Sequence, residues 1–83
     1  MQTKPLISVV VPVYNGASTI GGCLQALLAA RYARFEVIVV DDGSTDDTAQ
    51  IASRYPVRVI RLPQNVGAAR AKNEGAQRAR GEV

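Results

Sequence analysis

Two adjacent carboxylates follow an apolar run near the middle of the chain. Residues 37–40 are Val, Ile, Val and Val, and Asp41 and Asp42 come directly after them. An ionised carboxylate only accepts hydrogen bonds, so this pair suits a ligand that presents N–H or O–H donors, such as a nucleobase or a ribose. Adjacent acids can also hold Mg²⁺, and acids after a strand often serve turns and helix caps. On type and spacing alone, all three roles are open.

Two further segments carry groups that suit a nucleotide. Tyr14 follows an apolar stretch and offers a ring on which a flat base can stack; a core role is less favoured, because the apolar stretch has already ended. Arg70 and Lys72 fall in the first turns of a predicted helix, where the helix N-terminus favours anions. We expect these two side chains either to meet a diphosphate or to be ordinary exposed helix charges.

Alternating strands and helices position these groups. Strands are predicted over residues 6–11, 36–41 and 57–62, and helices over residues 17–30, 45–55 and 68–80. The first two strands are apolar on both faces, which is typical of a parallel sheet covered by helices. Right-handed crossovers between consecutive parallel strands give the strand order 3-2-1. The predicted fold is therefore a single α/β, three-layer, Rossmann-like unit, β-α-β-α-β-α, over residues 1–83.

This topology brings the candidate groups together. In an open parallel sheet, ligands bind in the crevice beyond the carboxyl ends of the strands. The loops at residues 12–16, 41–45 and 63–70 all follow strands, so we expect them to meet at that edge. Pro12 is expected to end the first strand, because proline lacks the N–H that a sheet ladder uses.

The predicted helix at residues 17–30 carries one apolar stripe with the spacing of a single helix face. The stripe consists of Ile20, Cys23, Leu24, Leu27 and Leu28. Cys23 is therefore expected to pack in the core. As the one cysteine of the chain, it excludes an internal disulfide framework. Asn15 or Ser18 is expected to cap this helix.

The charges are unevenly distributed along the chain. Seven of the ten basic residues lie between residues 54 and 80, and the net charge is +3. The basic half is expected to be a solvated surface or a region attracted to phosphate. No basic run with interleaved aromatic residues occurs, which indicates no nucleic-acid partner. No apolar run reaches the roughly 18 residues of a membrane span, and a cytoplasmic location is expected.

Common phosphate-binding and metal motifs are absent from the sequence. There is no G-x-x-x-x-G-K-S/T motif and no G-x-G-x-x-G after the first strand, which excludes a P-loop and the dinucleotide fingerprint. The chain has no histidine, which excludes a histidine-based catalytic triad. A magnesium-dependent, receiver-like domain is disfavoured, because such domains also place acids after the first strand, where this chain has Pro12, Val13 and Tyr14.

Three blocks of sequence resemble family 2 glycosyltransferases of the GT-A fold. The blocks are VVVPVYN at residues 9–15, VVDDGSTDDT at residues 39–48, and residues 65–75, which begin NVG and end AKNEG. Each block alone is moderately specific. All three occur in the family's order and at natural spacing, and the resemblance extends from Ile7 to Val83.

The resemblance implies a nucleotide-sugar donor, usually a UDP-sugar. Pro12 and Tyr14 would flank the uracil, with Tyr14 stacking on it, and Asp42 would accept the hydrogen bond of the uracil imide. Asp41 and Gly43 would shape the pocket, which makes Asp42 the better candidate for recognising the base and Asp41 for holding the turn. The implied nucleotide-binding residues are Pro12, Tyr14, Asn15, Asp41, Asp42, Gly43, Arg70 and Lys72.

The chain also departs from the family pattern. Many members carry an acid soon after the Tyr-Asn pair, where this chain has Gly16 and Ala17, so one ribose contact is missing. The usual arginine of the third helix is Lys72, which keeps the charge but lacks the bidentate fork. The family's metal-binding D-x-D follows a fourth strand beyond Val83. A divalent metal, Mg²⁺ or Mn²⁺, is thus expected for a longer parent, with its ligands mostly outside this chain.

These departures lead to an expectation about the chain as a whole. Residues 81–83 resemble the start of a fourth strand, so we expect an N-terminal portion of a longer domain whose remaining half is missing. The open edge of the first strand is then expected to allow self-association. The parent would transfer a sugar to a glycan, lipid or similar hydroxyl acceptor, as in cell-wall or polysaccharide biosynthesis. No catalytic residue is assigned within the chain. The alternative is a non-catalytic, Rossmann-like nucleotide-binding module.

Overall fold

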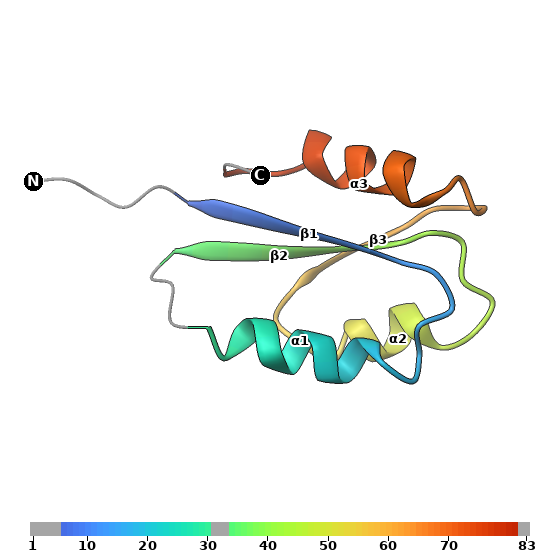
Figure 1. The fold of residues 1–83 in the computed structure, drawn as a ribbon, viewed down its shortest axis with the longest axis horizontal. Coiled ribbons are helices and arrows are strands. Elements are labelled where there is room, and N and C mark those ends of the chain that lie inside the picture. Colours follow the sequence, from blue (N-terminus) through green and yellow to red (C-terminus); the bar gives the residue numbers. More distant parts are fainter. Residues whose placement is uncertain (1–5, 31–33, 82–83) are drawn as a thin grey trace, which may run out of the picture.

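A three-stranded parallel sheet forms the middle layer of the molecule (Figure 1). The structure is a computed structural model, and it describes residues 6–30 and 34–81. The elements are β1 (Ile7–Val13), α1 (Ile20–Leu28), β2 (Phe35–Asp41), α2 (Thr48–Ala52), β3 (Arg58–Arg61) and α3 (Ala68–Gln77). The sheet order is β1-β2-β3, which confirms the predicted order 3-2-1 and the α/β fold class.

Alternate residues of β2 build two separate core layers. Val37 and Val39 pack with Ile20, Leu24 and Ala52 on the face covered by α1 and α2. Side chains of a strand alternate between the two faces of the sheet, so the intervening β2 residues face α3 instead. Figure 1 shows this sandwich, with α3 on one side of the sheet and the first two helices on the other.

A close approach of α3 to the sheet completes the second layer. Ile38 and Val40 pack there with the buried Ala71. A Cβ placed on Gly75 would lie 2.5 Å from Val10 Cγ1 and 2.8 Å from Val40 Cγ2. The missing side chain at Gly75 therefore permits the approach of the helix to β1 and β2.

The prediction that Pro12 ends the first strand is wrong. Pro12 lies inside β1, paired in register with Val40. The Val13 carbonyl accepts the amide hydrogen of Asp42 at 2.8 Å. The backbone N–H and C=O of Val13 therefore point toward β2, and the backbone polar groups of residue 12 point the other way. The nitrogen of Pro12 therefore faces the open edge of the sheet, where its missing hydrogen removes no ladder bond.

The start of α1 and the place of Cys23 also differ from expectation. The helix begins at Ile20 and has no side-chain cap; instead the Gly16 carbonyl accepts the amide of Ile20 at 2.8 Å. Ile20 and Leu24 are buried, but Cys23 is exposed. Cys23 lies about 100° from Leu24 around the helix, on the flank of a buried stripe narrower than the sequence suggested.

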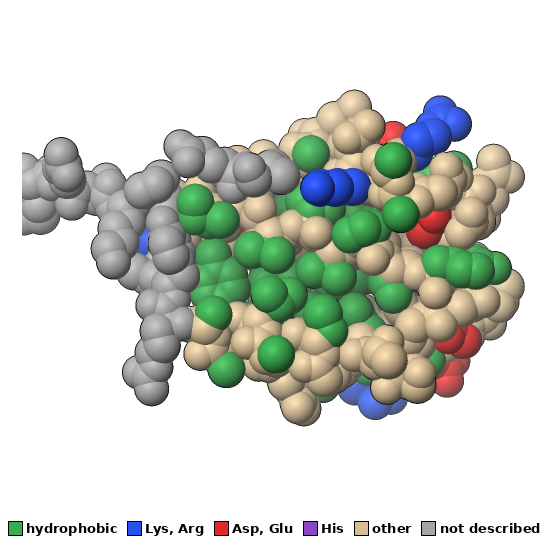
Figure 2. Space-filling model, in the orientation of Figure 1, with side chains coloured by type: hydrophobic (Ala, Val, Ile, Leu, Met, Phe, Trp, Pro, Cys, Tyr) green, Lys and Arg blue, Asp and Glu red, His purple; other side chains and the backbone are tan. Residues whose placement is uncertain are grey.

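The edge of β1 that does not pair with β2 is free in the sheet. Figure 2 shows hydrophobic side chains gathered over β1 in the band between α1 and α3. The end of the described chain lies beside this edge, because the Gly81 amide donates to Ser8 Oγ at 2.9 Å. The fourth strand expected over residues 81–83 lies mainly outside the described residues. Within the described residues, no helix is long and apolar enough to cross a membrane.

Candidate functional site

Three loops meet at the carboxyl ends of the strands, as the topology predicts. They follow β1, β2 and β3, and Figure 1 shows them together at one end of the sheet. A hollow of about 120 Å³ opens between them. The residues that line it are Pro12, Val13, Tyr14, Asp42, Asn65, Gly67 and Ala68. Residues from all three loops therefore face one space.

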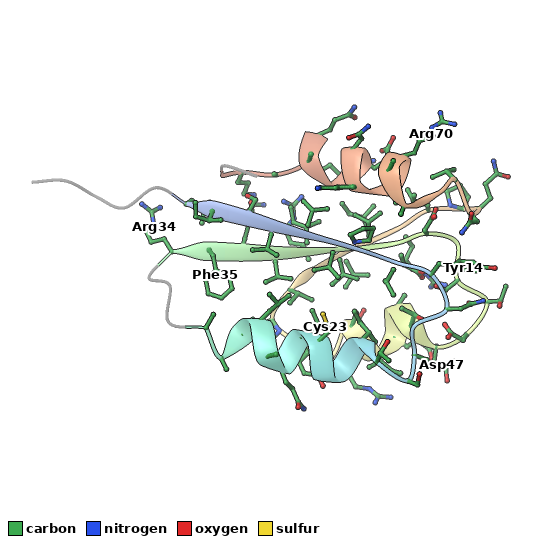
Figure 3. All side chains as sticks on the ribbon, in the orientation of Figure 1. Tyr14, Cys23, Arg34, Phe35, Asp47 and Arg70 are labelled. Carbon is green, nitrogen blue, oxygen red and sulfur yellow. The ribbon has the colours of Figure 1, made fainter. Side chains whose placement is uncertain are left out.

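Tyr14 provides the exposed ring of this hollow. It is 51% exposed and is the one large hydrophobic residue of the described chain that stands so far out of the core. Figure 3 shows it at the loop end of the sheet, away from the packed layers. An exposed ring on the wall of a hollow can stack on a flat ligand without any rearrangement of the core.

Asp42 lines the same hollow and carries a buried carboxylate. The residue is 3% exposed, and its two oxygens accept the amides of Val66 at 2.8 Å and Gly67 at 3.0 Å. These contacts tie the end of β2 to the loop before α3. Each carboxylate oxygen has a second lone pair, so Asp42 retains the capacity to accept a hydrogen bond from a ligand.

Asp41 has a different place and different partners. It is 2% exposed, and its Oδ1 accepts the amide of Ser44 at 3.0 Å. Its Oδ2 lies 3.8 Å from Nε of Arg61, whose side chain is 68% exposed. A pair this long and this open to water contributes little. The hydrogen bond to Ser44 makes Asp41 part of the turn that follows β2.

The two adjacent acids have different partners in the structure. Their carboxylates are engaged by different groups, Asp41 by the turn at Ser44 and Asp42 by the loop at Val66 and Gly67. In the part of the chain that the structure describes, no three Asp, Glu, Cys or His side chains come together as candidate metal ligands. The described residues thus offer no third carboxylate, thiol or imidazole beside this pair.

Gly43 allows two of the loops to touch. Its φ is 73°, in the left-handed region that favours glycine. A Cβ at this position would lie 2.5 Å from the backbone nitrogen of Asn65 and 2.5 Å from the carbonyl carbon of Gln64. Gly43 therefore lets the loop after β3 pack directly on the loop after β2.

Asn15 joins the loop after β1 to the loop after β2, and it does not line the hollow. Its Oδ1 accepts the amide of Thr45 at 2.8 Å, and its own amide donates to Ser44 Oγ at 2.8 Å. The sequence placed Asn15 among the nucleotide-binding residues or at a helix cap. In the structure its side chain bonds to the loop after β2, and α1 receives no cap from it. Nucleotide contact stays a prediction for Asn15.

Sequence reasoning missed two polar residues that also join the loop after β1 to the segment after β2. Thr48 Oγ1 accepts the amide of Gly16 at 2.9 Å, and Asp46 Oδ2 accepts the amide of Ala17 at 3.2 Å. The hydroxyl of Thr48 also donates to Asp46 Oδ1, and this bond is the main reason that the pKa of Asp46 is lowered. The signal was present in the Ser-Thr-Asp-Asp-Thr run, but such runs usually serve only their own helix.

The two predicted phosphate contacts lie on opposite flanks of α3. Arg70 lines a different hollow, of about 360 Å³, between β3 and α3, and Figure 3 shows its side chain pointing away from the sheet. Lys72 is exposed. It lies two positions after Arg70, which on a helix is a rotation of about 200°. Because Arg70 faces the β3 side, Lys72 lies on the β1 side. The structure does not bring Arg70 together with Tyr14 and Asp42, and diphosphate contact stays a prediction for both basic residues.

A parallel sheet with a crevice at its carboxyl edge defines the chain as a Rossmann-like unit. The particular family follows from comparison with known proteins. The family model described as Glycosyl transferase family 2 matches residues 8–83, so the chain belongs to this family. The suspected resemblance is thereby confirmed.

Individual relatives agree with this assignment. The chain is 43% identical over 82 residues to "Glycosyltransferase GlyG" of Streptococcus pneumoniae, and the aligned region covers 93% of this chain and 27% of the relative. It is 34% identical over 89 residues to "Glycosyltransferase AglE" of Haloferax volcanii, which covers 99% of this chain and 29% of the relative. The chain thus spans less than a third of the length of these relatives.

Solved structures share the fold. The mannosyltransferase PcManGT from Pyrobaculum calidifontis, in complex with GDP-Man and Mn²⁺, matches with a TM-score of 0.87 and 31% identity over 95% of this chain and 26% of that one. The S. aureus protein TarS 1–349, in complex with UDP-GlcNAc, matches with a TM-score of 0.84 and 36% identity over 90% of this chain and 24% of that one. The predicted GT-A fold class is confirmed.

Proposed function

We propose that this chain recognises the nucleotide of a UDP-sugar as the N-terminal part of a glycosyltransferase domain. The observation that carries the proposal is the pairing of two groups on one hollow: the exposed ring of Tyr14 and the buried carboxylate of Asp42, which the amides of Val66 and Gly67 hold in place. A flat base stacks on the ring, with Pro12 beside it, and presents an N–H to the carboxylate.

The chemistry of this pair favours uracil. Uracil carries an imide N–H, whereas the corresponding nitrogen of cytosine is an acceptor and would face the acceptor-only carboxylate of Asp42. Guanine also has a ring N–H that a carboxylate can accept. The choice of uracil over guanine therefore rests on the family resemblance. The UDP-GlcNAc complex of TarS supports the same choice, while PcManGT was solved with GDP-Man.

The diphosphate is proposed to lie beside the first turn of α3. Ala68, the first residue of this helix, lines the same hollow as Tyr14. The free amides of a helix N-terminus attract anions. Lys72 is exposed on the flank toward β1 and is the better placed of the two predicted phosphate contacts.

Sugar transfer itself is proposed for a longer protein. This chain spans about a quarter of the compared structures, and its described residues provide no group of metal ligands. We propose that residues 1–83 form part of a domain whose remaining portion supplies Mg²⁺ or Mn²⁺ ligands and binds a hydroxyl of a glycan, lipid or similar acceptor. The chain alone is then inactive. A cytoplasmic location stays a prediction.

Titration of the purified chain with UDP tests the stacking role. Tyr14→Ala removes the ring, whereas Tyr14→Phe keeps the ring and loses only the hydroxyl. Loss of a base–aromatic stack is expected to weaken UDP binding by about 1–3 kcal/mol in Tyr14→Ala, with Tyr14→Phe close to wild type. Wild-type UDP binding that Tyr14→Ala leaves unchanged would contradict the proposal. So would tighter binding of GDP than of UDP.

A further inference from the structure

Asn15 lies at the junction between the loop after β1 and the loop after β2. Its φ is 50°, which makes it the one non-glycine residue of the described chain with a positive φ. Asparagine is among the residues that tolerate this left-handed conformation best. The conformation turns the chain immediately after Tyr14, the residue that carries the exposed ring.

The side chain of Asn15 is fully used within the protein as an acceptor. Its Oδ1 accepts from the Thr45 amide at 2.8 Å and from Thr45 Oγ1 at 3.3 Å. The Asn15 amide donates to Ser44 Oγ at 2.8 Å. Ser44 is itself held through its own amide by the buried carboxylate of Asp41, at 3.0 Å. A continuous chain of hydrogen bonds therefore connects the end of β2 to the residue beside Tyr14.

From this geometry we infer that Asn15 is a positioning residue that sets the gap between the Tyr14 ring and the Asp42 carboxylate. This inference rests on the proposed nucleotide site. Tyr14 and Asp42 both line the hollow, and Asn15 does not. Asn15 acts on the bound base through Tyr14, by tying the loop that carries the ring to the turn that follows Asp42.

Two substitutions at Asn15 separate the carboxamide from the backbone. Asn15→Gly tolerates the positive φ and removes the acceptor oxygen. Asn15→Asp keeps an acceptor oxygen at the same place. Gln50→Ala is the control, because it removes an exposed amide side chain of α2 that lies outside the junction. We expect UDP binding to weaken about tenfold in Asn15→Gly, and to stay within about twofold of wild type in the other two variants.

A double-mutant cycle tests whether Asn15 works through Tyr14. In a Tyr14→Ala background, Asn15→Gly should cause no further loss of UDP affinity, because the ring that it positions is already gone. Additive losses would overturn the inference. An unchanged affinity in Asn15→Gly, with Tyr14→Ala still weak, would overturn it and leave the proposed function intact. An unchanged affinity in Tyr14→Ala would count against the proposed function itself.

A measurement without ligand provides an independent check. Hydrogen exchange of the Thr45 amide, followed by NMR, reports directly on its bond to Asn15. We expect exchange at least tenfold faster in Asn15→Gly, with the wild-type rate restored in Asn15→Asp and retained in Gln50→Ala. The same Thr45 exchange rate in Asn15→Gly and wild type would overturn the inference.

Discussion

The carboxylate of Asp42 and the amide of Gly67 are joined by a hydrogen bond of 3.0 Å, although 25 residues separate them in the chain. Gly67 has a φ of 96° and precedes the first residue of α3. The bond therefore fixes the start of α3 relative to the end of β2. The group proposed to recognise the base also holds the helix proposed to receive the diphosphate, so the two halves of a nucleotide site are set by one side chain.

Gly43→Ala should destabilise the fold by about 2 kcal/mol or more, because the new Cβ meets a backbone that cannot move aside and the φ of 73° is strained for alanine. Gly22→Ala is the matched control. Gly22 lies in α1 with nothing within 4 Å of a new Cβ, so alanine should stabilise the protein by roughly 0.5–1 kcal/mol. Urea unfolding of both variants measures the difference. Equal stabilities would contradict the packing of the loops on Gly43.

Glu36 should make stability depend on pH in acid. The hydroxyl of Ser8 donates to Glu36 Oε2 at 2.6 Å and the Arg80 amide donates at 2.7 Å, and these bonds lower the pKa of the Glu36 carboxyl below its usual 4.5. The unfolded chain then binds the proton more readily than the folded one. The contribution of Glu36 is complete above about pH 4.5 and is lost as pH falls through the lowered pKa.

Glu36→Gln tests this pH dependence. The variant should lose the acid-sensitive part of the unfolding free energy, so that wild type and variant converge as pH falls from about 6 to about 3. Glu74→Gln is the control, because Glu74 pairs with Arg78 on the exposed side of α3 at 2.8 Å. A wild type whose advantage over Glu36→Gln grew as pH fell would contradict the assigned bonds.

Cys23 should react as a surface thiol in the folded protein. It is exposed on α1, next to the buried Leu24. A thiol reagent should modify it in native buffer at a rate close to that in urea, and Cys23→Ser should change the unfolding free energy by no more than about 0.5 kcal/mol. Protection by several orders of magnitude in the native state would instead restore the core role that the helical spacing suggested.

These cases show which features a sequence pattern can predict. The unbroken apolar run of β2 was decisive for the fold, because only a strand covered on both faces needs apolar residues at every position. The helical stripe of α1 was less informative: spacing groups Cys23 with Ile20 and Leu24, but the width of the buried face depends on how the helix tilts on the sheet. The prediction for Pro12 failed because a strand accepts proline where the backbone nitrogen faces an unpaired edge, and the sequence does not show which edge of β1 is unpaired.

The candidate site was predicted unevenly for a related reason. Tyr14 and Asp42 could be placed together, because strand ends of a parallel sheet share one edge. The role of Asn15 depends on hydrogen bonds to Ser44 and Thr45, some thirty residues away, and a local pattern does not encode them. Arg70 and Lys72 are close in sequence but lie on opposite flanks of α3. Their places follow only once it is known that Ala71, between them, is the residue buried against the sheet.

The most direct test of the central claim compares UDP and CDP binding to wild type and to Asp42→Asn by calorimetry. The claim is that the Asp42 carboxylate accepts the N–H of uracil. Wild type should bind UDP at least about tenfold more tightly than CDP, since a charge-assisted hydrogen bond contributes about 1.5–3 kcal/mol. Asp42→Asn loses the charge and one of the two oxygens that accept from Val66 and Gly67, and its NH2 group can donate to cytosine. The preference should therefore fall or reverse. Asp47→Asn, at an exposed position of the helix start, should keep the wild-type preference. Equal binding of UDP and CDP by wild type, or an unchanged preference in Asp42→Asn, would contradict the claim.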